Sequence, residues 1–437
     1  MRVAVVGAGW AGLAAAVEAT RAGHAVVVFE ASRTAGGRAR TLPAAPPATA
    51  LAQPPFMLDN GQHILIGAYT ETLRLMREVG VEEAAVLRRL PLSLRFADGS
   101  GIALPRLPAP WDVLAGVLAA RGWSWRDRMS VLGQALIWRA RSFACEPDMT
   151  VAELCRGVAA RAMAELIEPL CVSALNTPAA EASARVFLRV LKDALFAVRG
   201  GGDLLLPSTD LGALFPEPAL AWLARQGAQL QLGRRVATLE RPGAQESTQK
   251  PAWRIGGQDF AQVILACPAR EAARLVTSAL PDDAAAVRWC ASADGLRRAP
   301  IATVYATATT GLVAPILCLH SDAETAPAQF VFDRGQLGGP TGLLAFVVSA
   351  SSTDLPALQA AVVRQAKSQL GMVVEPLQTV IEKRATFACT PGLVRPAARI
   401  AAGLVACGDY IEGPYPATLE AAVRSGVAAA QALAENT

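Results

Sequence analysis

The first thirty residues carry the clearest alternation of apolar and polar positions in the chain. Residues 3–6 and 24–30 are short runs rich in valine, which predict two strands, and residues 13–22 between them predict a helix that ends at Gly23. A strand, a helix and a second strand in this order form a βαβ unit whose strands lie parallel. The pattern therefore predicts an α/β fold that begins with a Rossmann-like unit.

The turn between the first strand and the helix has the spacing G-x-G-x-x-G, with glycines at Gly7, Gly9 and Gly12. Such a turn lets backbone amides approach a pyrophosphate and lets the helix pack closely on the strand. Glu30 ends the second strand, where an acidic side chain accepts hydrogen bonds from a ribose. Together these features predict dinucleotide binding, with NAD and FAD both open at this point.

Apolar patterns later in the chain predict another sheet. Alternating positions predict strands at 301–305, 329–332 and 343–348, and the glycine-rich segment 335–342 joins the last two as a hairpin loop. A helix at 355–370 follows, so we expect a mixed substrate sheet with helices on one face. The remaining predicted elements are a helix at 218–226, strands at 228–232, 235–239 and 260–267, a helix at 269–275, a strand at 404–409 and a helix at 418–433.

Residues 111–143 predict helices with an unusual mixture of tryptophan and arginine. The tryptophans are Trp111, Trp123, Trp125 and Trp138, and the arginines between and beside them are Arg121, Arg126, Arg128, Arg139 and Arg141. Aromatic rings beside cationic side chains are typical of a membrane interface. An ordinary pair of core helices with a solvated arginine face has the same composition, so both interpretations stay open. The helical pattern continues over 151–198.

Composition narrows the classes of function. The chain has 437 residues, of which 52% are hydrophobic and 18% charged, and this balance excludes disorder and favours apolar ligands. Its 41 Lys and Arg residues against 37 Asp and Glu residues leave a net charge of +4, too balanced for a nucleic-acid-binding surface. Eight cysteines without a C-x-x-C pair and three histidines give no recognisable zinc spacing, so no metal site is expected.

The N-terminal segment and the lengths of the apolar runs indicate where in the cell the protein resides. The chain starts at once with a strand and lacks the features of a signal peptide. No uninterrupted apolar run reaches the roughly 18 residues of a membrane-spanning helix. We therefore expect a cytoplasmic protein, either free or peripherally associated with the inner face of the cytoplasmic membrane.

Three further segments show a resemblance to known flavoproteins. Residues 36–41, G-G-R-A-R-T, resemble the G-G-R-x-x-T extension of the flavin-containing amine oxidase and phytoene desaturase superfamily. Residues 59–69 resemble its D-x-G-x-H-x-x-x-G-x-Y block, which lies near the isoalloxazine, and residues 408–409 resemble its C-terminal G-D motif. The resemblance implies FAD as the cofactor.

The segments 7–13, 59–69 and 406–426 together look like the squalene-associated FAD-dependent desaturase group, the hydroxysqualene dehydroxylases. This match spans the chain and is weakest through residues 100–230. It implies a polyisoprenoid substrate and the reductive loss of the hydroxyl group from hydroxysqualene, giving squalene. It also implies a GR2-type FAD-binding domain with an interleaved α+β substrate domain.

The implied domain division is as follows. Residues 1–85, 200–275 and 390–437 form the FAD-binding domain, and residues 86–199 and 276–389 form the substrate domain, with a helical part at 110–199 and a sheet part at 300–350. The sequence shows no second dinucleotide fold, so the electron donor stays unidentified and either visits the site or acts through a partner.

Site residues follow from the motifs and the resemblance together. The expected FAD-binding residues are Gly7, Gly9, Ala11, Gly12, Glu30, Gly36, Gly37, Arg38, Gly61, Gln62, Val236, Gly408, Asp409 and Thr418. His63 is the expected catalytic residue that helps the hydroxyl leave, because an unperturbed histidine pKa near 6.5 suits proton delivery. Tyr415, Glu412 and Tyr305 are the alternative acids, each being polar in an apolar segment.

Other functions remain open on the sequence. A carotenoid or phytoene-like desaturase would run the flavin in the oxidising direction on a similar polyene. A flavin amine oxidase is expected to use a lysine near the flavin, and the chain has only four lysines: Lys192, Lys250, Lys367 and Lys383. A flavin-binding membrane scaffold without turnover is the alternative outside the enzymes.

Overall fold

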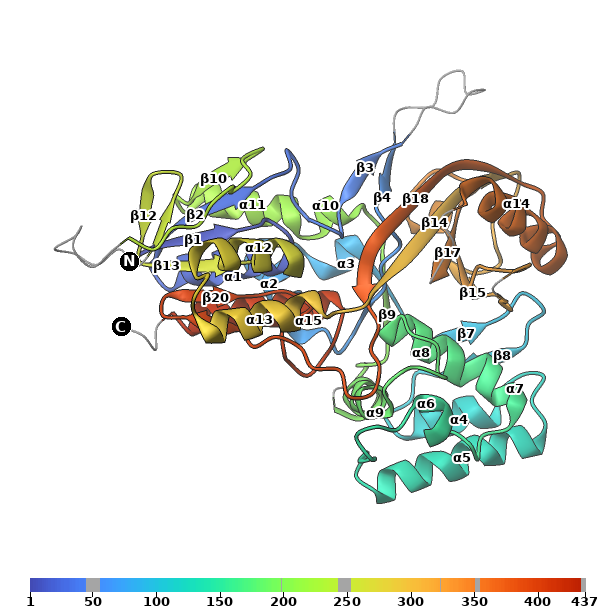
Figure 1. The fold of residues 1–437 in the computed structure, drawn as a ribbon. Coiled ribbons are helices and arrows are strands. Elements are labelled where there is room, and N and C mark those ends of the chain that lie inside the picture. The colour runs from blue at the N-terminus through green and yellow to red at the C-terminus, as the bar shows by residue number, and fades with distance from the viewer. Residues whose placement is uncertain (45–55, 198, 243–252, 323, 350–353, 434–437) are drawn as a thin grey trace.

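The computed structural model describes residues 1–44, 56–197, 199–242, 253–322, 324–349 and 354–433. One sheet has the strand order β10-β2-β1-β13-β20-β19. Its strands are β1 (Arg2–Val6), β2 (Ala25–Glu30), β10 (Gln229–Leu232), β13 (Gln262–Leu265), β19 (Arg399–Ala401) and β20 (Leu404–Ala406). All neighbours are parallel except β19 and β20, so the carboxyl ends of β1, β2 and β13 meet at one edge. The predicted Rossmann-like α/β fold is confirmed (Figure 1).

Helices cover both faces of this sheet. One face packs on α1 (Trp10–Arg21), α2 (Thr70–Glu78), α11 (Pro216–Arg225) and α15 (Leu419–Gln431), and the other on α12 (Ala269–Ala279) and α13 (Ala284–Asp294). Helix α1 begins three residues before its predicted start, because Gly9 in an extended conformation is its N-cap. Helices α15 and α1 cross closely, since an ideal Cβ on Gly426 would lie 2.2 Å from the carbonyl oxygen of Ala11. Glycine is required at this crossing.

The second sheet has the strand order β15-β16-β17-β14-β18 and forms the core of the other lobe (Figure 1). Its strands are β14 (Arg298–Ala308), β15 (Ile316–Cys318), β16 (Phe330–Asp333), β17 (Leu343–Ser349) and β18 (Val374–Phe387). Every pairing is antiparallel, so the expectation of a mixed sheet is wrong. The apolar pattern also did not predict β18, a strand rich in polar residues that pairs with β14 along most of its length.

The two faces of the second sheet have different partners. Helix α14 (Leu355–Gln365) packs on one face against Ala302, Val304 and Ala306. The opposite face, which carries Tyr305, belongs to a core shared with the helical region. That region contains α4 (Trp111–Leu118), α5 (Trp125–Ala140), α6 (Val151–Leu154), α7 (Ala160–Ala162), α8 (Glu168–Leu175) and α9 (Ala184–Lys192). Residues 59–63 meet this face through Tyr305, on the side that α14 leaves open.

The remaining elements are shorter. They are β3 (Thr41–Pro43), β4 (Met57–Asp59), β5 (Leu65–Ile66), α3 (Glu83–Val86), β6 (Leu87–Leu90), β7 (Ser93–Arg95), β8 (Gly101–Ala103), β9 (Leu204–Pro207), α10 (Leu211–Leu214), β11 (Trp253–Ile255) and β12 (Gln258–Phe260). The strand predicted at 235–239 is wrong. The guanidinium of Arg274 donates hydrogen bonds to the carbonyls of Val236 and Ala237 at 3.2 and 2.8 Å, in place of a neighbouring strand.

Among the described residues, no helix is long and apolar enough to cross a membrane. The domain boundaries given above stay a prediction. The first sheet draws its strands from the three segments expected for the FAD-binding domain and the second from 276–389, but β18 lies outside the sheet part expected at 300–350.

Candidate functional site

The turn after β1 is shaped by glycines that no other residue could replace. Gly7 has a φ of 114°, and an ideal Cβ there would lie 2.6 Å from the carbonyl oxygen of Ala266 at the end of β13. At Gly12 an ideal Cβ would lie 1.9 Å from the carbonyl oxygen of Gly7. Both positions therefore exclude a side chain. The result is that the N-terminus of α1 sits directly over the carboxyl ends of β1 and β13.

Glu30 is held against this turn by two backbone donors. The N–H groups of Ala8 and Ser32 donate to its two carboxylate oxygens at 2.7 and 2.8 Å. Each oxygen keeps a further lone pair, which is what recognition of a ribose diol requires. Gly9 provides no side-chain cap to α1, and the first turn of α1 holds no acidic residue. The N-terminal amides of α1 are thus open to an anion.

The G-G-R segment lies beside the glycine turn. The N–H of Gly36 donates to the carbonyl of Ala8 at 2.8 Å, and Gly36 forms a parallel bridge with Gly9. An ideal Cβ on Gly37 would lie 3.2 Å from the Cα of Gly9. The backbone of the G-G-R segment therefore lies close to the backbone of the glycine turn. A site that holds a pyrophosphate between backbone amides requires such an arrangement.

Arg38 joins this segment to the C-terminal G-D motif. Its guanidinium forms an ion pair with the buried carboxylate of Asp409 and donates to the carbonyl of Ala385 at 2.7 Å. Burial opposes the charge on Arg38, but Asp409 outweighs it and raises the pKa of Arg38. Burial lowers the pKa of nearby Arg298, and the charges of Arg38 and Arg384 lower it further, against the attraction of Asp409.

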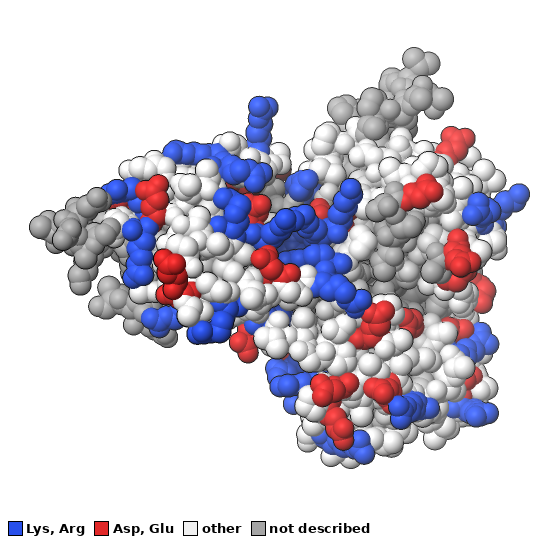
Figure 2. Space-filling view, viewed as in Figure 1, with Lys and Arg blue, Asp and Glu red and all other residues white. Residues whose placement is uncertain are grey.

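Arg38, Arg298 and Arg384 thus lie near two acids, Asp409 and Glu382, and the remaining positive charge suits a pyrophosphate. Figure 2 shows Lys and Arg side chains gathered between the two lobes on the face drawn. The turn of the G-D motif is fixed by Ser425, whose hydroxyl accepts from the N–H of Gly408 at 2.7 Å and donates to the carbonyl of Gly408 at 3.0 Å. Thr418 is the N-cap of α15, and its hydroxyl accepts from the N–H of Ala421.

The structure thus brings most expected FAD-binding residues together. Gly7, Gly9, Ala11, Gly12, Glu30, Gly36 and Gly37 surround the turn after β1, and Arg38, Gly408, Asp409 and Thr418 adjoin it from the C-terminal side. Val236 follows Gly233 and Arg234, whose N–H groups donate to the carbonyls of Ser32 and Glu30, and its own carbonyl accepts from Arg274. Gly61 and Gln62 lie in the block that contacts β14. Their individual contacts with FAD stay predictions.

Tyr305 on β14 anchors the block 59–63. Its hydroxyl donates to the carbonyl of Asp59 at 2.8 Å and accepts from the amide of Gln62 at 2.8 Å. The N–H of Asp59 lies 3.2 Å away as a second donor. Burial raises the pKa of Tyr305, and the charge of Asp59 adds to the rise. Tyr305 therefore fixes the backbone of the block with a hydroxyl that holds its proton strongly.

One ring nitrogen of His63 forms a hydrogen bond within the segment that carries it. Its Nδ1 lies 2.9 Å from the carbonyl oxygen of Gly61, so Nδ1 carries the proton in the neutral ring and Nε2 is left for a ligand. Burial lowers the pKa of His63 and the charge of Arg38 lowers it further, against the hydrogen bond to Gly61. The expectation of an unperturbed pKa does not hold, and the ring is neutral at pH 7.

The other two candidate acids lie on the loop before α15. The hydroxyl of Tyr415 donates to Asp193 at 2.8 Å, and burial raises the pKa of Tyr415 to about 12. Glu412 is exposed, on a loop whose carbonyls accept hydrogen bonds from Arg395. Neither lies in the block 59–63 that contains His63, whereas Tyr305 contacts this block directly.

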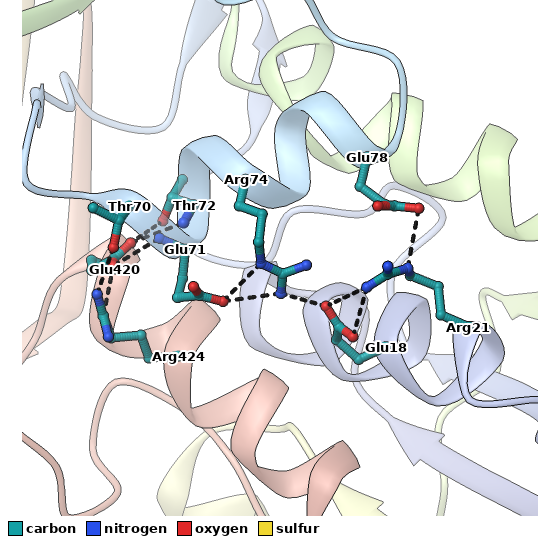
Figure 3. A network of polar contacts seen from close by, with 9 residues as sticks. All are labelled: Glu18, Arg21, Thr70, Glu71, Thr72, Arg74, Glu78, Glu420 and Arg424. Atoms are coloured by element: carbon teal, nitrogen blue, oxygen red, sulfur yellow. Dashed lines mark hydrogen bonds and ion pairs between the residues drawn. The ribbon is translucent and has the colours of Figure 1, made fainter.

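A buried carboxylate that the sequence reasoning missed ties α15 to α2. Glu420 is 1% exposed, and its carboxylate accepts from the N–H of Glu71 at 3.1 Å and from the N–H and hydroxyl of Thr72 at 2.9 and 2.7 Å. It also accepts from Arg424 at 2.6 Å. Figure 3 shows Glu420 of α15 at the start of α2, where it caps a helix that lacks a cap of its own.

The same network extends to α1. Arg74 of α2 forms ion pairs with Glu71 and with Glu18 of α1, and Arg21 of α1 pairs with Glu78 (Figure 3). Three helices from distant parts of the chain are therefore locked together beneath the site. The signal in the sequence was an acidic residue on the apolar face of the last helix, which only a buried partner explains.

Asp59 is a second buried acid that the sequence reasoning did not single out. It is 3% exposed, and its carboxylate accepts from the N–H of Leu211 at 2.8 Å. Burial raises the pKa of Asp59 to about 6, against that hydrogen bond and the charge of Arg334. Asp59 therefore holds a proton over part of the physiological pH range, next to the block that carries His63.

Comparison with known proteins agrees with this architecture. The family described as "Flavin containing amine oxidoreductase" matches residues 10–434. The chain belongs to this family. Two relatives, both hydroxysqualene dehydroxylases, cover 98% of the chain and 97% of their own length: that of Zymomonas mobilis is 27% identical and that of Rhodopseudomonas palustris 29%. The structure of an oxidoreductase from Methanosarcina mazei superposes with a TM-score of 0.70 at 18% identity, covering 100% of both chains.

Membership of the flavin-containing amine oxidoreductase family makes the protein an FAD-dependent oxidoreductase. The residues of the site fit this cofactor, because Gly7 and Gly12 leave no room for side chains and Glu30 and the N-terminus of α1 present donors and acceptors to a nucleotide. Arg38 and Asp409 would lie at its pyrophosphate and ribityl chain. The expected cofactor and enzyme class are thus confirmed.

Proposed function

We propose that this protein removes the hydroxyl group of hydroxysqualene reductively and releases squalene. The observation that carries the proposal is the composition of the wall opposite the cofactor cradle. There the half-buried imidazole of His63, with Nε2 left for a ligand, approaches Gly61 on the sheet face that carries Val347 and Val380. A long hydrocarbon with one polar group matches a largely apolar wall with one reactive polar atom. The two relatives that span the whole chain support the same assignment.

The reaction requires the C–O bond to break and its oxygen to leave as water after taking up a proton. FAD in its reduced form supplies the hydride that replaces the hydroxyl. The protein's own residues exclude water that would recapture a carbocation, through the apolar core shared by the second sheet and the helical region.

His63 is the proposed proton donor to the departing oxygen. Because burial lowers the pKa of His63, its acid form is the minor species at pH 7, and an acid role requires a rate that rises as the pH falls. Tyr415, Glu412 and Tyr305 remain the alternatives. Two of them have less suitable hydroxyls, since Tyr305 and Tyr415 donate to other groups and burial raises the pKa of both.

The direct test is incubation of the purified holoenzyme with hydroxysqualene and a chemical reductant, followed by mass spectrometry of the lipid extract. We expect squalene, and none when the reductant is omitted. A desaturated product from phytoene or another polyene with oxidised enzyme, and no squalene, would favour the desaturase alternative.

We further propose that helices α4 and α5 rest on an anionic lipid surface. The side chains of Leu107, Trp111, Leu118, Trp125, Met129, Leu136 and Ile137 are exposed, and we call them the apolar rim. On α5, Trp125, Met129 and Leu136 lie on one face at helical spacing, opposite the buried Val131 and Trp138. An apolar face directed outward is rare on a surface that only water covers.

Charge and position agree with this orientation. Arg126, Arg139 and Arg141 are exposed beside the rim, and α5 lies at the outer edge of the helical region (Figure 1). Trp123 and Trp138 do not belong to the rim, because both are buried and Trp123 donates to Glu165 at 2.8 Å. The two interpretations of the tryptophan and arginine pattern therefore apply to different tryptophans. A polyisoprenoid substrate would enter from lipid rather than from water.

Flotation with vesicles that contain anionic lipid tests the rim. We expect the holoenzyme to float and a Trp111→Ser/Trp125→Ser variant to remain largely in the soluble fraction. A matched control, Val313→Ser/Val373→Ser, removes two exposed apolar side chains elsewhere and should float like the unmodified protein. Flotation of both variants to the same extent would contradict the proposal.

A further inference from the structure

Thr303 is a polar residue of the second sheet. It lies on the largely apolar face that contacts the block 59–63. It lies on β14 two residues before Tyr305, so the two side chains share a face. Its neighbours across the sheet are Val347 on β17 and Val380 on β18. The adjacent residues of β14, which point the other way, pack against α14.

The hydroxyl of Thr303 has no hydrogen-bond partner among the described residues. Thr303 is 1% exposed, and its Oγ1 is buried without a donor or acceptor in reach. A buried hydroxyl without a partner destabilises a folded protein, and such groups are rare. The nearby Tyr305, in contrast, forms three hydrogen bonds with the block. The hydroxyl of Thr303 is therefore free to bond a ligand, and unlike other unpaired buried groups it lies beside Gly61 and His63.

Its position shows where that ligand would lie. An ideal Cβ on Gly61 would lie 3.9 Å from the Oγ1 of Thr303 and 3.8 Å from the Cε1 of His63. The threonine hydroxyl and the imidazole therefore both lie beside Gly61. A side chain at Gly61 would lie between them at ordinary contact distance.

We propose that Thr303 is a further catalytic residue, which donates a hydrogen bond to the departing oxygen of the substrate. The proposal rests on the function proposed above. As the C–O bond breaks, its electron pair moves to oxygen, and the oxygen takes up a proton and leaves as water. Thr303 keeps its own proton and stabilises the negative charge that develops before that uptake, together with His63.

Two variants separate the hydroxyl from the shape of the side chain. Thr303→Val keeps the shape and removes the donor, and Thr303→Ser keeps the donor. We expect kcat/KM for hydroxysqualene to fall at least about tenfold in the valine variant and to stay within about threefold in the serine variant. Binding, followed through the flavin absorbance, should weaken for hydroxysqualene and stay unchanged for squalene, which lacks the oxygen.

Thermal unfolding of the substrate-free holoenzyme gives an independent readout. Thr303→Val removes an unpaired buried hydroxyl, so its melting temperature should rise by about 1 to 3 °C. The control is Thr20→Val near the end of α1, whose hydroxyl is also buried without a partner but lies outside the site. It should raise the melting temperature similarly and leave kcat/KM unchanged.

The outcomes are distinct. The inference is wrong if Thr303→Val has the kcat/KM of the unmodified protein, or if it binds hydroxysqualene and squalene more weakly by the same factor. It is also wrong if this variant has a changed affinity for FAD or a lower melting temperature than the unmodified protein. If the unmodified enzyme makes no squalene, the proposed function fails, and the inference that depends on it fails as well.

Discussion

The cofactor cradle and the substrate-facing sheet are built on opposite principles. In the cradle, backbone groups make most of the contacts, as when the amides of Ala8 and Ser32 bind Glu30 and Gly36 pairs with Ala8. On the sheet, side chains define the surface, and polar atoms such as the Oγ1 of Thr303 stand among valines. Gly7 and Gly12 of the cradle exclude any side chain, whereas the face of the sheet tolerates a wider choice of residues except where a polar atom is needed. Conformation therefore determines cofactor binding, and isolated side chains determine the reaction.

The largest expected effect comes from breaking the cradle. In Gly12→Val the added side chain would overlap the carbonyl of Gly7, so α1 cannot keep its place over β1. We expect purified protein without bound FAD and an FAD affinity lowered more than about a hundredfold, measured by fluorescence titration. Gly133→Ala on α5, where an ideal Cβ has no atom within 4 Å, is the matched control and should bind FAD normally. Retention of FAD by the Gly12 variant would show that the cradle is not where FAD binds.

On the substrate side, His63 should dominate the pH profile. Its pKa lies below 6.5 because the ring is buried, so the acid form gains population as the pH falls and kcat/KM should rise up to about tenfold for each unit between pH 8 and that pKa. His63→Gln should lose about 10²- to 10⁴-fold and show a flat profile at unchanged FAD occupancy. A loss below about tenfold, or a rate that does not depend on pH in the unmodified enzyme, would make His63 a structural residue.

The contacts of Glu420 that join α15 to α2 should affect the stability of the protein more than its catalytic rate. Glu420→Ala leaves the start of α2 uncapped and deprives Arg424 of its partner, which should lower the free energy of unfolding by about 2 to 4 kcal/mol. Denaturant titration of the holoenzyme measures this loss. Glu153→Ala, which breaks the exposed pair with Arg156 and uncaps the short helix α6, should lose no more than about 1 kcal/mol. Equal losses in the two variants would contradict a special role for Glu420.

The same contrast explains what the sequence could predict. The cradle was predictable because Gly7, Gly12 and Glu30 stand at fixed spacings that backbone geometry imposes. The strand β18 was not predictable, because its polar residues pair with β14 only in the folded chain. The partner of Glu420 lies 348 residues away at Thr72, and the unpaired state of Thr303 exists only once β14 meets the block 59–63. Contacts of this kind depend on tertiary structure and leave little trace in local sequence.

The central claim is that reduced flavin in this protein gives its electrons to a hydroxysqualene carbon. A single turnover without oxygen tests it most directly: the holoenzyme is reduced, freed of excess reductant and mixed with hydroxysqualene while flavin absorbance and squalene are followed together. We predict that the flavin is reoxidised at the rate at which squalene forms, with one squalene per flavin. Flavin that stays reduced, or is reoxidised without squalene, would contradict the account.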